Sequence, residues 1–368
     1  MIPQAPKNPL AVVAITKNGR NLAHALQMKL KEVDVYISSK LAKGDEQEHG
    51  MILYAQSTRE LLQQIFKRYR GVILLFSLGA GVRMLASLLE DKKKDPCVVV
   101  VDNGGRFAIS VLSGHLGGGN ELTIKVANAI GAIPVITTAS DVQETLAVDL
   151  LGREFGWELE DSQHMTAVSA AVVNEDPVAI VQESGERNWW KYDSDLPCNL
   201  TCFSFLEGAT KGEASTAIII SHRILPEISY FKKVVVYRPK VIVLGIGCNR
   251  GTSADEIEQV IDETLEQLLL SKKSVKAIAS IDLKKDEEGL IKVTNKNRWI
   301  FHTYSAKELN QVPVSKRSET VYQYTGAYGV SEPAAKRYSM NDECLLTKKK
   351  SGNVTISVAL IEHRLGKE

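Results

Sequence analysis

Apolar runs alternate with amphipathic stretches along the first 140 residues of the chain. The apolar runs predict strands at residues 10–15, 33–37, 71–76, 97–102 and 134–137. The amphipathic stretches predict helices at residues 21–31, 58–69, 82–89 and 121–130. Gly131 follows the last helix and is expected to cap it. This alternation of strand and helix indicates a mostly parallel sheet that is covered by helices.

The pattern is weaker between residues 141 and 238. Ser140 and Gln143 have the spacing of a capping box, which predicts a helix over residues 142–155. A short helix at 167–173 and a strand at 178–181 are also expected. Residues 188–206 mix aromatic residues, proline and polar residues without periodicity. We therefore expect a loop-rich insertion or linker at 188–206, within a variable central region.

A clear α/β pattern returns from residue 240. Ser253 and Glu256 predict a capping box ahead of a helix. The apolar face of that helix is expected to consist of Ile257, Val260, Ile261, Leu265, Leu268 and Leu269. Strands are predicted at 241–245 and 275–281, short helices after Ser305 and at 333–338, and a closing hairpin from 345–347 and 354–361.

The chain is thus predicted to have the α/β fold class in three parts. Residues 1–140 form an N-terminal parallel-sheet α/β domain, residues 141–238 a variable central region, and residues 239–368 a smaller C-terminal α/β domain.

The charges of the chain balance, with 45 Lys and Arg residues against 44 Asp and Glu residues. Such a chain has no general field for nucleic acid or an anionic membrane, so neither is expected as a partner. No apolar run approaches the roughly 20 residues of a membrane span. The first ten residues also lack the features of a signal peptide, so we expect a cytoplasmic protein.

Several common catalytic patterns are absent from the sequence. The five cysteines and seven histidines do not have zinc-site spacing, so we expect no metal in the folded protein and read the cysteines as buried, reduced thiols. No G-x-S-x-G elbow occurs, which disfavours an α/β-hydrolase with a serine nucleophile. No G-x-x-x-x-G-K-[ST] loop occurs, which disfavours a P-loop nucleotide hydrolase.

Glycine-rich loops follow predicted strands, where open α/β sheets bind ligands. Gly79 and Gly81 would let backbone N–H groups approach an anion, and Arg83 could hold a carboxylate. The alternative is a tight strand-to-helix turn with Arg83 in water. A second loop of this kind contains Gly104, Gly105 and Arg106.

The third loop is the densest in glycine and contains a histidine. Its candidate substrate-binding residues are Gly117, Gly118, Gly119 and Asn120. Because glycine costs backbone entropy in ordered structure, this density favours a loop that exposes N–H donors at a helix N-terminus. His115 is a candidate acid or base, since imidazole titrates near neutrality, and Glu121 could orient it or act as a base itself. The alternative is a surface loop followed by an acid that caps the helix.

The fourth loop has the spacing G-x-G-x-x-x-G over Gly245, Gly247 and Gly251, which is one residue longer than a dinucleotide fingerprint. The acid at the end of the next strand, Asp282, lies about 30 residues past Gly251 instead of the usual 20 or so. A nicotinamide enzyme is therefore disfavoured. An anion-binding loop that includes Arg250 is the better interpretation.

As a set, these loops resemble a known family. The stretches GVILLFSLGAGVRML and VVVVDNGGRFAISVLSGHLGGGNELTIKVANAIGAIPVITTASD closely resemble the N-terminal domain of the CbiG family of cobalamin biosynthesis. The stretches VIVLGIGCNRGTSADEIEQVI, AIASIDLKKDEEGLI and TGAYGVSEPAA are similar to its C-terminal domain. The resemblance covers roughly residues 54–141 and 241–361, and the stretch between them matches only in place and length.

The resemblance implies cobalt-precorrin-5A hydrolase activity in the anaerobic route to cobalamin. In that reaction a lactone on a cobalt-bearing tetrapyrrole is opened and a two-carbon fragment leaves as acetaldehyde. Lactone opening needs a base and donors for the oxyanion, which glycine-loop N–H groups could supply. The macrocycle can accept the electrons and the cobalt belongs to the substrate, so we expect no protein-bound cofactor.

Roles for individual residues then follow from the chemistry. His115 is the expected base or acid, Glu121 supports it, and Glu332 in the C-terminal domain is the competing base. The acetate and propionate arms of the substrate are expected to bind Arg83, Arg106, Arg250 and Lys284. The site is expected to lie between the two α/β domains.

Two other functions stay open at this stage. A binding protein that shuttles a labile tetrapyrrole would need the same loops but would release no acetaldehyde. A nicotinamide oxidoreductase would instead bind a dinucleotide tightly. The sequence leaves open whether the protein forms a homodimer or makes transient contacts with neighbouring pathway enzymes.

Overall fold

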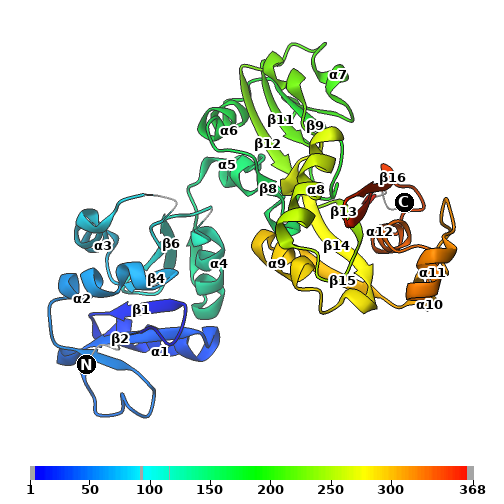
Figure 1. The fold of residues 1–368 in the computed structure, drawn as a ribbon. Helices are drawn as coiled ribbons and strands as arrows, with labels where there is room; N and C mark the ends of the chain where they lie inside the picture. Colours follow the sequence, from blue (N-terminus) through cyan, green and yellow to red (C-terminus); the bar gives the residue numbers. More distant parts are fainter. Residues whose placement is uncertain (1–4, 92–93, 116, 363–368) are drawn as a thin grey trace. The chain divides into compact units, whose positions relative to one another are not determined.

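A computed structural model describes residues 5–91, 94–115 and 117–362. The chain divides into two compact units, Met1–Thr145 and Leu146–Glu368 (Figure 1), and each is described by itself. Within the described ranges, no helix combines the length and the apolarity that crossing a membrane requires.

The first unit contains a seven-stranded sheet in the order β3-β2-β1-β4-β5-β6-β7. Its strands are β1 Leu10–Ala14, β2 Val33–Ser38, β3 Ile52–Tyr54, β4 Gly71–Leu75, β5 Cys97–Val101, β6 Phe107–Leu112 and β7 Ile133–Val135. Neighbouring strands are parallel except for β5 and β6, which are antiparallel. The carboxyl ends of β6 and β7 therefore lie at the opposite edge of the sheet from those of β1, β4 and β5.

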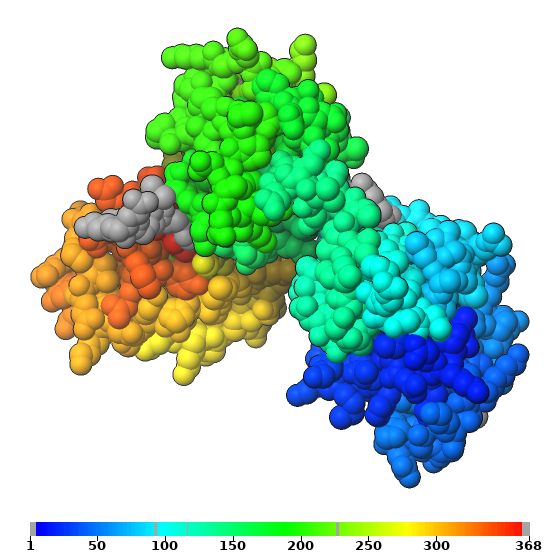
Figure 2. All heavy atoms as spheres, turned by 180° about the vertical axis from the view of Figure 1, so that it is seen from behind, coloured from blue at the N-terminus to red at the C-terminus, as the bar shows by residue number. Residues whose placement is uncertain are grey.

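Helices cover both faces of this sheet, as the sequence predicts. One face packs against α1 Lys17–Leu30 and α4 Gly119–Ile130, and the other against α2 Thr58–Ile65 and α3 Leu78–Leu85. Gly131 ends α4 in a left-handed conformation with φ of 72°, which confirms the predicted cap. In Figure 2, which draws every heavy atom, the unit is a closely packed body coloured blue to teal.

The loop expected at residues 188–206 is confirmed over 188–199, which contain no helix or strand. The rest of the central region folds as a five-stranded sheet in the order β10-β9-β11-β12-β8, which the sequence analysis did not predict. The strands are β8 Glu158–Leu159, β9 Val178–Gln182, β10 Leu200–Phe203, β11 Thr216–Ile220 and β12 Lys233–Arg238. The predicted short helix and strand are confirmed as α6 Met165–Val173 and β9, and a further helix is α7 Leu206–Ala209.

The long helix predicted over residues 142–155 does not form. The chain forms only α5 Ala139–Val142 and two short 3₁₀ turns there, and Ser140 lies inside α5 instead of capping it. Gly152 and Gly156 have φ of 72° and 73°, which a continuous right-handed helix does not allow.

The C-terminal part carries a five-stranded sheet in the order β15-β14-β13-β17-β16. Its strands are β13 Ile242–Cys248, β14 Val275–Ile281, β15 Ile300–Tyr304, β16 Leu346–Ser351 and β17 Val354–Leu360. Its helices are α8 Ala254–Gln267, α9 Glu288–Asn297, α10 Ala306–Leu309, α11 Glu319–Thr325 and α12 Ser331–Ser339. The predicted α/β class and the closing hairpin of β16 and β17 are confirmed.

Two details of α8 differ from the sequence prediction. The hydroxyl of Ser253 accepts the N–H of Glu256, but the Glu256 carboxylate accepts the N–H of Asn353 instead of returning to Ser253. Only half of the capping box therefore forms. Leu269 lies past the end of α8 and is 54% exposed, so it does not belong to the buried face.

Candidate functional site

A histidine–carboxylate pair lies at one edge of the N-terminal sheet. The Nε2 atom of His115 is 2.8 Å from Oδ2 of Asp141 and 3.1 Å from Oγ of Ser140. His115 follows β6, and Asp141 follows β7 in α5. Because β6 and β7 are adjacent and parallel, their carboxyl ends bring the two side chains together. The sequence analysis missed Asp141, although it stands only four residues after the strand predicted at 134–137.

Asn120 holds this pair in place from the first turn of α4. Its Nδ2 donates to Oδ2 of Asp141 and to Oγ1 of Thr138, each at 2.9 Å. Its Oδ1 accepts the hydroxyl of Ser110 at 2.7 Å. The side chain is buried. The predicted substrate-binding amide is thus engaged inside the protein, where it orients the carboxylate of Asp141.

The arrangement suits proton transfer. When Asp141 accepts Nε2–H of His115, the lone pair of the imidazole is on Nδ1, which becomes the basic atom. The carboxylate also stabilises the imidazolium that forms when Nδ1 takes up a proton. His115 keeps some contact with solvent, since its side chain is 16% exposed. Glu121 has an exposed side chain that pairs with Lys125 at 2.7 Å, and its catalytic role stays a prediction.

The glycines of the His115 loop serve close packing. The N–H groups of Gly118, Gly119 and Asn120 donate to the carbonyls of residues 115, 113 and 114. A Cβ at Gly117 would lie 2.4 Å from Cβ of Ser113, and one at Gly119 would lie 2.8 Å from a backbone oxygen. Gly118 has φ of 80°. These three N–H groups are therefore already used within the loop, and the assignment of Gly117, Gly118, Gly119 and Asn120 to the substrate stays a prediction.

The other two N-terminal loops lie at the opposite edge of the sheet from His115. Gly79, Gly81 and Arg83 follow β4, and Gly104, Gly105 and Arg106 follow β5. Because β5 and β6 are antiparallel, the length of a strand separates these loops from His115, about 16 Å for five residues. Both arginines are exposed, but the structure does not bring them to the histidine.

The loop after β5 is a closed turn around Asp102. The Asp102 carboxylate accepts the N–H groups of Gly104 at 3.0 Å and Arg106 at 2.8 Å, and its backbone carbonyl accepts that of Gly105 at 2.9 Å. Although burial opposes ionisation, these N–H donors hold the pKa of Asp102 below its ordinary value. The backbone donors that the sequence analysis assigned to a ligand are already used.

Four of the predicted C-terminal residues line one cavity of about 720 Å³. They are Gly247, Arg250, Lys284 and Glu332. The cavity lies at the carboxyl ends of β13 and β14, between the β16–β17 hairpin and α11 and α12. Gly245 is not part of it, because Gly245 packs against the backbone of Ser331.

Both predicted cations of this cavity already have carboxylate partners. Arg250 makes two contacts with Asp286, at 2.7 and 3.0 Å, and Lys284 lies 2.9 Å from Glu287. Burial disfavours ionisation of Glu287, but hydrogen bonds from Lys284 and from the N–H of Gly251 hold its pKa below the ordinary value. The assignment of Arg250 and Lys284 to substrate stays a prediction.

Glu332, the competing base, has a structural role in this cavity. Its carboxylate accepts the N–H and the hydroxyl of Ser315 at 2.9 and 2.8 Å and pairs with Lys336 at 2.8 Å. These contacts anchor the segment before α11 to α12. The role of Glu332 as the competing base stays a prediction.

Three further lysines of the cavity were missed by the sequence analysis. They are Lys316, Lys348 and Lys350. Among the described residues, no carboxylate pairs with any of them. The sequence offers one signal for two of them, since alternate positions of a strand point to the same side.

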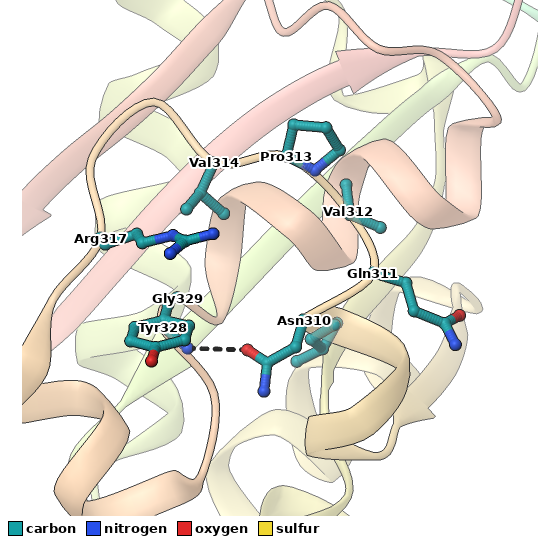
Figure 3. Close-up of a pocket in the computed structure, with 9 residues that line it drawn as sticks. Asn310, Gln311, Val312, Pro313, Val314, Arg317, Tyr328 and Gly329 are labelled. Carbon is teal, nitrogen blue, oxygen red and sulfur yellow. Dashed lines mark hydrogen bonds between the residues drawn. The ribbon is translucent and has the colours of Figure 1, made fainter.

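A smaller cavity of about 340 Å³ adjoins the larger one (Figure 3). Val314 and Gly329 line both. Figure 3 shows Arg317 extending over the ring of Tyr328, with its guanidinium carbon 4.9 Å from the ring centre. The N–H of Tyr328 donates to Oδ1 of Asn310 at 3.0 Å, which joins these two residues of the cavity wall.

The cysteines do not provide a nucleophile at either site. Cys248 lines the larger cavity, but burial raises the pKa of its thiol above the ordinary value. The expectation of buried thiols holds for Cys97, whereas Cys198 and Cys202 are exposed.

Comparisons with known proteins match nearly the full length of the chain. The family model Cobalamin synthesis G N-terminal matches residues 60–141, Cobalamin biosynthesis central region matches 146–239, and Cobalamin synthesis G C-terminus matches 242–359. A cobalt-precorrin-5A hydrolase of Priestia megaterium is 53% identical over 98% of this chain and 97% of its own length. The cobalt-precorrin-5A hydrolase of Salmonella typhimurium is 34% identical over 95% of this chain and 97% of its own length.

Among solved structures, a putative cobalamin biosynthesis protein G homolog from Sulfolobus solfataricus is 21% identical, with 96% of this chain and 97% of that chain covered and a TM-score of 0.36. The two full-length relatives are sufficient for the assignment. The chain belongs to the cobalamin synthesis G family, CbiG.

Proposed function

We propose that this protein is a cobalt-precorrin-5A hydrolase of anaerobic cobalamin biosynthesis. It opens the lactone of cobalt-precorrin-5A and releases acetaldehyde to give cobalt-precorrin-5B. The observation that carries the proposal is the 53% identity, over nearly the full length of both chains, to the Priestia megaterium protein of that name.

His115 acts as the base in the proposed mechanism. The imidazole takes a proton from water as the oxygen of that water bonds to the lactone carbonyl carbon, and Asp141 stabilises the resulting imidazolium. The ring C–O bond then breaks, and the proton passes from His115 to the departing alkoxide. The neutral imidazole next removes the proton of the freed secondary alcohol. The carbon–carbon bond breaks as the acetaldehyde C=O forms, and the electron pair enters the macrocycle.

The proposal needs no cofactor that is bound by the protein. The macrocycle accepts the electron pair, and cobalt enters the site as part of the substrate. A cytoplasmic location belongs to the same proposal and is tested by cell fractionation. A homodimer would show in sedimentation of the purified protein, and transient contacts with neighbouring pathway enzymes would show when those enzymes are added to it.

Acetaldehyde release tests the proposed function directly. The purified protein is mixed with cobalt-precorrin-5A, and acetaldehyde is measured through NADH oxidation by alcohol dehydrogenase. We expect one acetaldehyde for each substrate consumed and none with substrate alone. A protein that binds the substrate and releases no acetaldehyde would instead be a tetrapyrrole carrier, and the hydrolase proposal would be wrong.

A further inference from the structure

We propose that the 720 Å³ cavity of the C-terminal domain binds carboxylate arms of a tetrapyrrole through Lys316, Lys348 and Lys350. The ligand class rests on the proposed function. The cavity and the three lysines that line it are observed in the structure and do not depend on that function.

Unbalanced charge is the first feature that points to an anionic ligand. Five cations line the cavity, and of the described residues in its wall only Glu332 is acidic. Asp286, Glu287 and Lys336 already balance Arg250, Lys284 and Glu332. Three lysine charges therefore converge on one concave surface without a partner carboxylate in the described part of the chain. Convergent ammonium groups attract an anion with several carboxylates more strongly than one with a single charge.

The alternation of side chains along β16 places Lys348 and Lys350 on the side of the cavity and Lys349 on the other side. Lys348 and Lys350 stand at alternate positions of β16 and both line the cavity, about 7 Å apart along the strand. Lys349 lies between them, points to the other side and donates to Oε1 of Gln267 at 3.1 Å. Lysines on an edge strand also discourage pairing with other chains. That role would not require the two lysines to line a cavity. It would also not require them to face the same cavity as Lys316, which lies in a different segment of the chain.

The position of Lys316 is fixed by its neighbour. Ser315 is held by Glu332 through its N–H and its hydroxyl, so the backbone that carries Lys316 is tied to α12. On the other side of the same segment, Arg317 rests on Tyr328 (Figure 3). A fixed backbone lowers the entropy cost of placing the lysine against an anion.

The rest of the wall suits a flat, largely apolar ring. Leu283 is 52% exposed and Tyr324 is 82% exposed, and both line the cavity with Val314 and Val330. Large exposed apolar side chains beside convergent cations are typical of a site for an amphipathic ligand. A tetrapyrrole with carboxylate arms has both features.

Equilibrium binding of uroporphyrin I, an octacarboxylic tetrapyrrole, tests this site without turnover. Its fluorescence is titrated with the full-length protein at low and at high salt. We expect saturable binding that weakens with salt, because screened charges attract less. The double substitution Lys348→Ala and Lys350→Ala should raise the dissociation constant about 10-fold or more, and Lys316→Ala about fivefold.

Lys349→Ala is the matched control, because it removes the same charge from the same strand on the other side. It should change the dissociation constant less than twofold. No saturable binding by the parent protein, an unchanged constant for the double variant, or an equal loss for Lys349→Ala would each overturn the proposal. If the predicted pattern appears but the protein releases no acetaldehyde from cobalt-precorrin-5A, the hydrolase function fails and the binding site stands.

Discussion

Replacing Gly245 by alanine should destabilise the C-terminal domain, because β13 passes directly beneath α12 at this residue. A Cβ built there lies 1.8 Å from the carbonyl oxygen of Ser331 and 2.8 Å from its carbonyl carbon. It also lies 2.9 Å from Cβ of Ala335. None of these atoms can rotate away, so either α12 or β13 must shift. The sequence analysis assigned Gly245 to ligand binding, whereas the structure assigns it to packing.

The size of the effect follows from that overlap. Overpacked cores lose about 1–3 kcal/mol of unfolding free energy, and contact with backbone atoms on a rigid helix belongs at the upper end, about 3 kcal/mol. Gly79→Ala is the matched control, since a Cβ there meets no heavy atom within 4 Å and Gly79 lies in the first turns of α3. It should stabilise its own unit by about 0.5–1 kcal/mol.

Hydrogen exchange read peptide by peptide separates the two units. In Gly245→Ala, amides of β13, β17 and α12 should lose protection, while those of the first unit stay as in the parent. In Gly79→Ala, protection of α3 should rise slightly. If Gly245→Ala keeps full protection and instead weakens binding of uroporphyrin I, the packing explanation is wrong and the glycine contacts a ligand.

Two other outcomes depend on single side chains. Burial lowers the pKa of His222 to about 4, against about 6.5 in an unfolded chain, so the unfolded state binds more protons and stability falls as pH drops from about 6.5 to 4. His222→Asn should remove up to about 3 kcal/mol of this fall in the free energy of unfolding, as measured by urea unfolding of the second unit over that pH range. An unchanged pH dependence of the unfolding free energy would contradict the assignment. Asp141→Asn should slow acetaldehyde release about 10- to 100-fold with little change in substrate affinity, because the imidazolium loses its carboxylate; a parent-like rate would contradict this role.

Periodicity predicts β1, β2, β4 and β5, whose residues are nearly all buried, and the four long helices, which each have one apolar side. It misses β3 and β6, whose residues are mostly only half-buried. It does not give strand direction. The antiparallel pairing of β5 with β6 reverses the edge at which the His115 loop emerges. The Asp102–Gly105 turn, with asparagine and two glycines between apolar runs, is a hairpin signal that could have predicted this reversal.

The sequence analysis did not predict the central sheet, although two apolar runs in this region indicate strands. The runs TAIII and KVVVYR form β11 and β12, and every residue of β11 is buried. Short apolar runs bounded by polar residues are a sufficient signal for buried strands. The polar loop between β9 and β10 has no such pattern, and that lack of periodicity is why the sequence analysis expected a loop at 188–206.

The sequence indicates some residues of the candidate sites but not their partners. His115 was found because a histidine in a glycine-rich loop is unusual, but its partner Asp141 becomes visible only when β6 and β7 are known to be parallel neighbours. Arg250 was found as a cation near a glycine loop, yet its neutralising partner Asp286 is 36 residues away along the chain. The unpaired state of Lys316, Lys348 and Lys350 depends on three-dimensional distances that no local spacing encodes.

The role of His115 is tested most directly by the single-turnover rate of acetaldehyde release from cobalt-precorrin-5A with enzyme in excess. His115→Ala should lower this rate constant about 100-fold or more, the usual contribution of general acid–base catalysis, with little change in substrate affinity. His49→Ala is the control, since His49 also faces a carboxylate, with Nε2 3.8 Å from Asp45, and should keep the parent rate. A His115→Ala enzyme that releases acetaldehyde at nearly the parent rate would contradict the mechanism, and Glu332 would then be the next residue to replace.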